Sequence, residues 1–186
     1  MPRGRRVATS DDLEVSAYLE IAEGRASEAE NEPQSVNEGI IVIDFGSQYS
    51  HLIARRIRDL KVYSEVFTAS STWETVRHIN PKGVILSGGP ASVYDPGAPR
   101  IPDWVFERDL PVLGICYGMQ ALVHQLGGEV VPGQLQEYGS AVLHQDGGEA
   151  SLFKELPPTF QVWMSHGDRI ATLPPGFSSL AYTENS

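Results

Sequence analysis

Residues 111–128 read PVLGICYGMQALVHQLGG, a strand pattern joined to a helix pattern by one sharp turn. The apolar run 111–115 predicts a short buried strand that leads directly into Cys116. The amphipathic stretch 117–126 predicts a helix, and Gly127 with Gly128 is a typical helix stop. The apolar side chains on one face of that helix are Met119, Leu122, Val123 and Leu126. A strand followed at once by a helix is the repeating unit of an α/β fold.

Three further units of the same kind precede this one in the chain. We expect strands over 40–43, 62–67 and 83–86, and helices over 48–60, 72–79 and 101–108. Because strands alternate with helices, we expect parallel βαβ units and hence an α/β fold with a doubly wound, mainly parallel sheet flanked by helices. After Gly128 the pattern changes to shorter strand-like pieces, separated by Gly and Pro turns, over 129–131, 140–144 and 160–164.

The first 38 residues have a different composition from the rest. They contain nine acidic and four basic residues among small side chains, so charge is much denser there than in 39–186. Such a segment buries too little apolar surface to offset the entropy of ordering, and we interpret 1–38 as an acidic, disordered tail. The stretch 11–22 could form a short helix, and a folded or partner-binding tail is the alternative. The domain would then occupy 39–186.

The composition bounds the class of protein. A chain of 186 residues accommodates one ordinary domain with a tail, and its 41% hydrophobic content supports a packed core. The formal charge of −10 repels phosphate backbones and anionic lipids, so we expect neither nucleic acid nor membrane as a partner. No apolar run approaches the roughly 18 residues of a membrane span, and a single cysteine cannot form an internal disulfide. We therefore expect a reducing, cytoplasmic setting.

The pattern Gly-x-Cys-x-Gly at 114–118 is typical of a nucleophile elbow. Glycines on both sides relieve crowding in a turn that projects the central side chain at a strand end and a helix start. The helix N-terminus should favour the reactive thiolate form of Cys116. The alternative is a buried structural cysteine, which is common in α/β cores. The elbow context favours the nucleophile.

A thiolate that attacks a carbonyl builds an oxyanion, which needs preorganised N–H donors. Gly89 lies in the loop after the neighbouring strand, and Tyr117 directly follows the cysteine, so their backbone N–H groups are the candidates. The alternative for 87–90 is a simple tight turn. This loop lacks the Lys and the Ser or Thr that a P-loop requires.

A cysteine nucleophile also needs a base, and histidine is the usual one. The five histidines are His51, His78, His124, His144 and His166. His166 could pair with Asp168 two residues later, but a local substrate-binding turn explains the same residues. The residues alone leave both readings open.

Four segments together resemble class I glutamine amidotransferases, and within them the GMP synthase branch. They are DFGSQY at 44–49, SGGP at 87–90, GICYGMQ at 114–120 and VWMSHGD at 162–168. The resemblance covers about 39–186 and implies a flavodoxin-like sheet, with glutamine as the substrate. It implies that Cys116 is the nucleophile, that Gly89 and Tyr117 supply the oxyanion N–H groups, and that Gln120, Ser165 and Gly167 hold the amino-acid end of glutamine. It also implies that His166 is not the catalytic histidine.

The chain departs from the family pattern in two places. The family's catalytic His and Glu belong to a later His-Pro-Glu element, and that triplet is not present in this sequence. The ATP pyrophosphatase domain of the branch, with its Ser-Gly-Gly-x-Asp-Ser loop, is also not present. We therefore expect a chain truncated in its C-terminal part, with little glutaminase activity alone. The resemblance implies no metal and no cofactor here, ATP and Mg²⁺ in the synthetase domain that converts XMP to GMP, and a homodimeric intact enzyme.

Three alternatives remain at this point. The chain could be the glutaminase part of anthranilate or carbamoyl-phosphate synthesis, which the nature of the following domain would distinguish. It could be a noncatalytic glutamine-binding or docking module, in which Cys116 would be inert to a glutamine-like electrophile. It could also be an unrelated flavodoxin-like domain, since a fold alone does not fix function.

Overall fold

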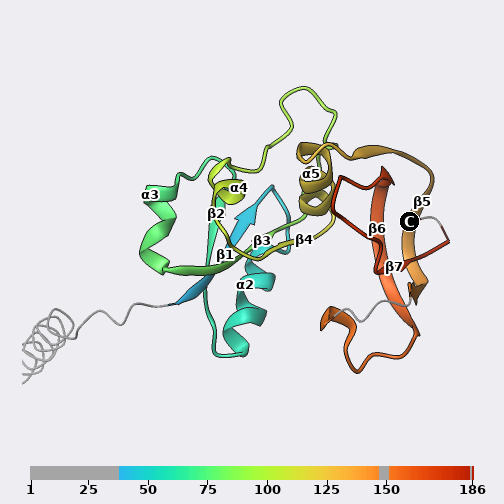
Figure 1. Ribbon diagram of the computed structural model, residues 1–186, viewed down its shortest axis with the longest axis horizontal. Helices are drawn as coiled ribbons and strands as arrows, with labels where there is room; N and C mark the ends of the chain where they lie inside the picture. Colours follow the sequence, from blue (N-terminus) through green and yellow to red (C-terminus); the bar gives the residue numbers. More distant parts are fainter. Residues whose placement is uncertain (1–37, 147–150, 185) are drawn as a thin grey trace, which may run out of the picture. The chain divides into compact units, whose positions relative to one another are not determined.

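Four parallel strands form the central sheet, in the order β2-β1-β3-β4 (Figure 1). Their bounds are β1 Gly39–Asp44, β2 Tyr63–Thr68, β3 Pro81–Leu86 and β4 Val112–Gly114. The four strands expected from apolar runs are confirmed, with ends that differ by one or two residues. The computed structural model describes residues 38–146, 151–184 and 186, and residues 37–186 form one unit. The expectation for the tail lies, except at Glu38, outside the described residues.

The helices that connect these strands are α2 Ser50–Asp59, α3 Trp73–Val76, α4 Trp104–Glu107 and α5 Tyr117–Gln125. The helix expected over 72–79 divides, because α3 continues as the 3-10 turn η1 Arg77–Ile79 and ends at Asn80 in the left-handed conformation, φ 48°. The helix expected over 101–108 is shorter, since Arg108 is already extended. Within the described ranges, no helix combines the length and apolar character that crossing a bilayer requires.

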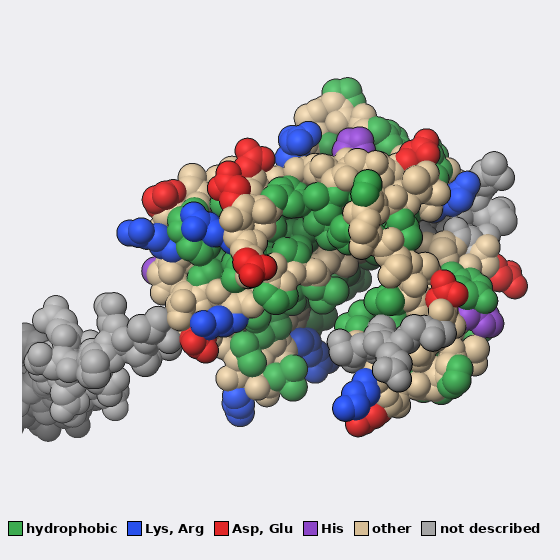
Figure 2. Space-filling model, viewed as in Figure 1, with side chains coloured by type: hydrophobic (Ala, Val, Ile, Leu, Met, Phe, Trp, Pro, Cys, Tyr) green, Lys and Arg blue, Asp and Glu red, His purple; other side chains and the backbone are tan. Residues whose placement is uncertain are grey.

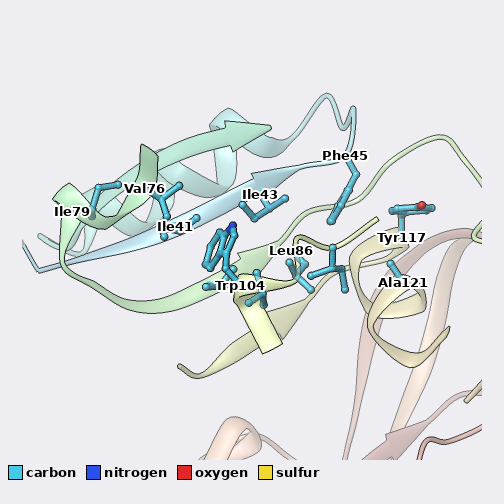
Figure 3. Packing of buried hydrophobic residues seen from close by; sticks show 12 residues of the cluster. Ile41, Ile43, Phe45, Val76, Ile79, Leu86, Trp104, Tyr117 and Ala121 are labelled. Carbon is cyan, nitrogen blue, oxygen red and sulfur yellow. The ribbon is translucent and has the colours of Figure 1, made fainter. Parts of the chain in front are cut away.

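Helices cover both faces of the central sheet. On one face, side chains of β1 and β3 pack against those of α3, η1, α4 and α5 (Figure 3). The labelled members of this cluster are Ile41, Ile43, Phe45, Val76, Ile79, Leu86, Trp104, Tyr117 and Ala121. On the other face, Val42 is fully buried, as is Ala54 of α2. The doubly wound α/β architecture is therefore confirmed.

The face that α2 covers is left open toward β4. Leu113 of β4 pairs in register with Ile85 of β3, and its side chain remains 44% exposed. Figure 2 shows that hydrophobic side chains also remain at the surface between charged ones on the face it displays.

The second sheet is antiparallel, in the order β6-β5-β7, with β5 Glu129–Gln145, β6 Thr159–Thr172 and β7 Ala181–Tyr182. The expectation of short separate pieces was wrong, because β5 and β6 are long continuous partners. The Gly and Pro residues that indicated turns are absorbed by a register shift between Pro132 and Glu137 and by Gly139 at φ 108°. The segment 165–168, expected as a turn, consequently lies inside β6.

Candidate active site

Cys116 occupies a strained turn between β4 and α5. Its φ of 49° and ψ of −115° place a non-glycine residue in a sparsely populated region, which costs about 1 to 3 kcal/mol. Backbone hydrogen bonds hold this geometry: Ile115 N donates to Leu86 O at 2.9 Å, and Gly118 N donates to Ser87 O at 3.0 Å. The sharp elbow expected from Gly-x-Cys-x-Gly is therefore present.

The two glycines that flank Cys116 are required by close packing. A Cβ added to Gly114 would lie 2.5 Å from Met119 Cα, and one added to Gly118 would collide with the carbonyl group of Leu86. Both obstacles are backbone atoms of the same strand–turn–helix unit or of β3. Only glycine lets the turn close this tightly while α5 packs on the sheet.

The two upstream glycine loops meet at the cysteine. A Cβ added to Gly88 would lie 3.6 Å from Cys116 Cβ and 3.7 Å from Ser47 Oγ. Gly89 packs on the backbone of Phe45, whose oxygen would lie 2.6 Å from an added Cβ. Cys116 itself is exposed rather than buried among aliphatic groups. The reading of this residue as a buried structural cysteine does not fit this environment.

A buried hydroxyl pair links these loops to Asp44 at the end of β1. Its Oδ1 accepts hydrogen bonds from Gly46 N at 2.9 Å, Ser47 N at 3.0 Å and Ser50 Oγ at 2.6 Å. Ser50 Oγ also lies 3.0 Å from Ser87 Oγ, and both serines are fully buried. Burial raises the pKa of Asp44. The hydrogen bonds from Ser50, Gly46 and Ser47 together lower it by more than burial raises it, so the net pKa is below its usual value.

We expect Asp44→Ala to lower the free energy of unfolding at pH 7 by about 1 to 2 kcal/mol, because three donors lose their acceptor. Since the folded-state pKa of Asp44 lies below the ordinary 3.8, this stabilisation is present above that pH and disappears as pH falls through the folded-state pKa. Urea unfolding of both proteins at pH 7 and at about pH 3 measures it.

The matched control is Asp59→Ala, which removes only an exposed carboxylate 3.8 Å from Arg56 and should change stability by less than about 0.5 kcal/mol. A difference between wild type and Asp44→Ala that stays constant down to acid pH would contradict the role given to the ionised carboxylate.

All six residues proposed from the sequence line one cavity of about 490 Å³. They are Gly89, Cys116, Tyr117, Gln120, Ser165 and Gly167. The first four come from the carboxyl edge of the parallel sheet and from α5, and the last two come from β6. The side chain of Tyr117 is anchored elsewhere, since its hydroxyl donates to Pro99 O at 2.5 Å and its ring lies 5.2 Å from that of Phe45.

Three cavity residues with polar side chains, Ser92, Tyr94 and Asp168, were not proposed as site residues from the sequence or were given another role there. Asp168, considered only as a partner of His166, accepts hydrogen bonds from Ser92 Oγ at 2.7 Å and from Tyr94 OH at 2.8 Å. Gln120 Nε2 donates to the backbone oxygen of Asp168 at 3.1 Å. Ser92 and Tyr94 lie in an irregular loop, so no periodic pattern could have assigned them to the cavity.

The tyrosine of this group keeps its proton. The Ser92 hydroxyl lowers the pKa of Tyr94, but the hydrogen bond to Asp168, burial and the charges of Asp168 and Asp95 raise it above its ordinary value. Tyr94 is therefore a hydrogen-bond donor at neutral pH.

The electrostatics of Cys116 differ from the sequence expectation. Part of Cys116 is exposed, but the surrounding atoms partly desolvate its sulfur. This desolvation raises the pKa of the thiol rather than lowering it. Among the cavity-lining residues of the described chain, none is a histidine. His78 lies 3.6 Å from Glu65, and His144 stacks on Tyr182, so both are engaged elsewhere. The side chain of His166 lies outside the described part of the structure. The cavity thus holds a protonated thiol.

Known proteins similar to this chain are glutamine amidotransferases and GMP synthases. The family model described as "Glutamine amidotransferase class-I" matches residues 41–186. A curated GMP synthase [glutamine-hydrolyzing] of Dehalococcoides mccartyi is 56% identical over 156 residues, which are 84% of this chain and 29% of that protein. One from Thermomicrobium roseum is 55% identical over 149 residues, 80% of this chain and 28% of that protein. The chain thus spans less than a third of the length of these relatives.

Solved structures agree on the fold. A crystal structure described as that of a GMP synthase subunit from Thermoplasma acidophilum has a TM-score of 0.70 and 26% identity, and it covers 80% of this chain and 74% of its own. A glutamine amidotransferase of Thermotoga maritima has a TM-score of 0.63 at 20% identity, covering 80% of this chain and 68% of its own, which bears on the fold alone.

Proposed function

From the premise that this chain belongs to the class I glutamine amidotransferase family, we propose that it carries the glutaminase site of a GMP synthase. The observation that carries this proposal is the strained Cys116 elbow at the mouth of a cavity that also holds Gln120, Ser165 and Gly167. The rivals from anthranilate or carbamoyl-phosphate synthesis are not favoured, because the curated relatives compared are GMP synthases. An unrelated flavodoxin-like domain is excluded by the family match.

In the proposed reaction the Cys116 thiolate attacks the side-chain amide carbon of glutamine. The carbonyl electron pair moves onto oxygen, where the N–H groups of Gly89 and Tyr117 would stabilise the charge. As this intermediate collapses, the C–N bond breaks, the departing NH2 group takes up a proton and leaves as ammonia, and a thioester remains on Cys116. Water then cleaves the thioester, giving glutamate and restoring the thiol. The family's His and Glu would move these protons.

The opposite wall of the cavity suits an amino acid. Gln120 comes from α5 and Ser165 with Gly167 from β6, so the amino-acid end of glutamine would lie between the two sheets of this unit. Asp168 is the one carboxylate among the described cavity-lining residues. A carboxylate in this wall favours an ammonium group over a neutral ligand end. The cavity therefore offers polar groups for the amino-acid end of glutamine as well as for its side-chain amide.

The ammonia would serve a synthetase domain or subunit that uses ATP and Mg²⁺ to convert XMP to GMP, and the intact enzyme would be a cytoplasmic homodimer. Among the described residues, the glycine-containing loop 87–90 is not a substitute phosphate site. In the loop 87–90 the Ser87 hydroxyl is fully buried and donates to Gly88 O at 2.9 Å, and Gly89 packs on Phe45. These groups do not fit a nucleotide phosphate. We therefore propose that ATP binds to the synthetase domain or subunit.

The proposal is tested by alkylation with an L-glutamine analogue whose amide is replaced by a chloromethyl ketone. We expect it to modify Cys116 at about pH 8.5, where more of the thiol is ionised, and with a rate that saturates with concentration. L-Glutamine should slow the modification about tenfold at concentrations well above its dissociation constant. Mass spectrometry of the 186-residue chain identifies the modified residue.

The matched control is Cys116→Ser, which should remain unmodified, and D-glutamine should not protect the wild type. An unmodified Cys116 in the folded wild type would favour the noncatalytic docking module. Modification without saturation and without protection would remove glutamine as the ligand.

A further inference from the structure

Asp168 joins three segments of the chain that line the cavity. Its two carboxylate oxygens accept separate hydrogen bonds, Oδ2 from Ser92 Oγ at 2.7 Å and Oδ1 from Tyr94 OH at 2.8 Å. Its backbone oxygen accepts a hydrogen bond from Gln120 Nε2 at 3.1 Å. These bonds connect β6 with the loop that follows β3 and with α5, at sequence separations of 76, 74 and 48 residues.

The loop that supplies the two hydroxyls is itself braced. Ser92 N donates to Asp95 Oδ2 at 2.9 Å, and Asp95 N donates to Ser92 O at 2.9 Å, so the turn 92–95 is closed on both sides. This turn begins shortly after Gly89, whose packing on Phe45 fixes the start of the loop. A displacement of the turn would therefore move Gly89 and would break the hydrogen bonds to Asp168.

The contribution of the two hydroxyls to the core is small. Tyr94 is 47% exposed, and its bond to Asp168 is exposed as well. Both residues nevertheless line the same cavity as Cys116. Loss of either hydroxyl should therefore affect the cavity wall more than the stability of the fold.

We propose that Ser92 and Tyr94 are positioning residues that act through Asp168 to hold the amino-acid end of the substrate. Two donors on two different oxygens fix the rotation of the carboxylate about its Cβ–Cγ bond. The hydrogen bond from Gln120 Nε2 to the backbone oxygen of Asp168 also holds the backbone of that residue. Three hydrogen bonds therefore fix the position of Asp168 in the cavity wall. The inference rests on the proposed glutamine site and adds two residues that touch neither the thiol nor the reacting amide.

The test uses Ser92→Ala and Tyr94→Phe with the chloromethyl ketone analogue of glutamine on the 186-residue chain. We expect the half-saturating concentration of the analogue to rise on the order of 3- to 10-fold in each variant, the effect of one lost hydrogen bond. The maximal modification rate at saturation should stay unchanged, and so should the rate with iodoacetamide, which needs no amino-acid site. Ser92→Thr, which keeps a hydroxyl, should restore most of the affinity.

Tyr63→Phe is the matched control, because it also removes a tyrosine hydroxyl that makes an exposed hydrogen bond to a carboxylate, that of Glu65, and neither residue lines the cavity. Tyr63→Phe should leave unchanged the half-saturating concentration of the analogue, the maximal modification rate and the rate with iodoacetamide. Unchanged half-saturation in both Ser92→Ala and Tyr94→Phe would overturn the proposal, as would an equal slowing with iodoacetamide, which indicates general disorder at Cys116. If Tyr94→Phe fails to fold, the comparison of Ser92→Ala with Ser92→Thr decides. Failure of the wild type to saturate contradicts the glutamine site itself, a result distinguishable from either of these.

Discussion

Extension of this chain through a His-Pro-Glu element of its family is expected to raise steady-state ammonia release from glutamine by about 10³-fold or more. The reason lies at Cys116. Burial raises the pKa of its thiol, so the nucleophile is protonated at neutral pH, and no histidine occurs among the described residues that line its cavity. A base that removes the thiol proton is therefore worth several orders of magnitude in an acyl-transfer reaction.

The measurement compares the 186-residue chain with the extended one under saturating glutamine. Cys116→Ala in the extended chain should return the rate to background, which shows that the gain passes through the same sulfur. Equal rates for the short and the extended chain would mean that a histidine already present serves as base. His166→Ala in the short chain then identifies it, since His166 is the histidine closest in sequence to the cavity residues of β6.

The second large effect is expected from Gly118→Ala, which should lower the free energy of unfolding by about 3 kcal/mol. A Cβ at this position would collide with the carbonyl group of Leu86, a backbone atom of β3 that cannot rotate away. The amide of Gly118 also donates to Ser87 O at 3.0 Å, so helix α5 cannot retreat without losing that bond. Denaturant unfolding followed by circular dichroism measures the change.

Gly88→Ala is the control for this substitution. It lies in the neighbouring loop, and its added Cβ would meet no atom closer than 3.6 Å, an ordinary contact. We expect its stability to be unchanged or higher by up to about 1 kcal/mol, because alanine restricts the unfolded chain more than glycine does. Similar losses in both variants would show that the loops yield easily and that the elbow is not tightly packed.

The sequence predicted most of what depends on local pattern. Apolar runs followed by amphipathic stretches were sufficient for the four parallel strands, because a buried strand and its covering helix each have a periodicity that is visible within about ten residues. The elbow at Cys116 could also be predicted, since only glycine on either side permits so sharp a turn. The presence of Gly89 and Tyr117 in the cavity could be predicted from their places just after neighbouring strands, because the carboxyl ends of parallel strands lie at the same edge of the sheet. Their role as oxyanion donors stays a prediction.

The sequence failed where long-range pairing overrides local signals. Gly139 lies in a segment where turns were expected, but β5 continues through it because Gly139 pairs with Met164 of β6, and Gly167 lies in β6 opposite the register shift between Pro132 and Glu137. The sign of the pKa change at Cys116 was also wrong. The helix N-terminus is a local feature, whereas the burial that raises the pKa depends on how the folded chain packs around the sulfur.

What the residues determined by themselves was the α/β architecture and the presence of a projected thiol, because both arise from contacts within a strand, a turn and a helix that are consecutive in the chain. Only the tertiary structure decided that Ser92 and Tyr94 donate hydrogen bonds to Asp168, at sequence separations of 76 and 74 residues. Hydroxyl and carboxylate groups have no periodicity, and their partners are fixed by how two sheets pack around α5 rather than by the pattern of either segment.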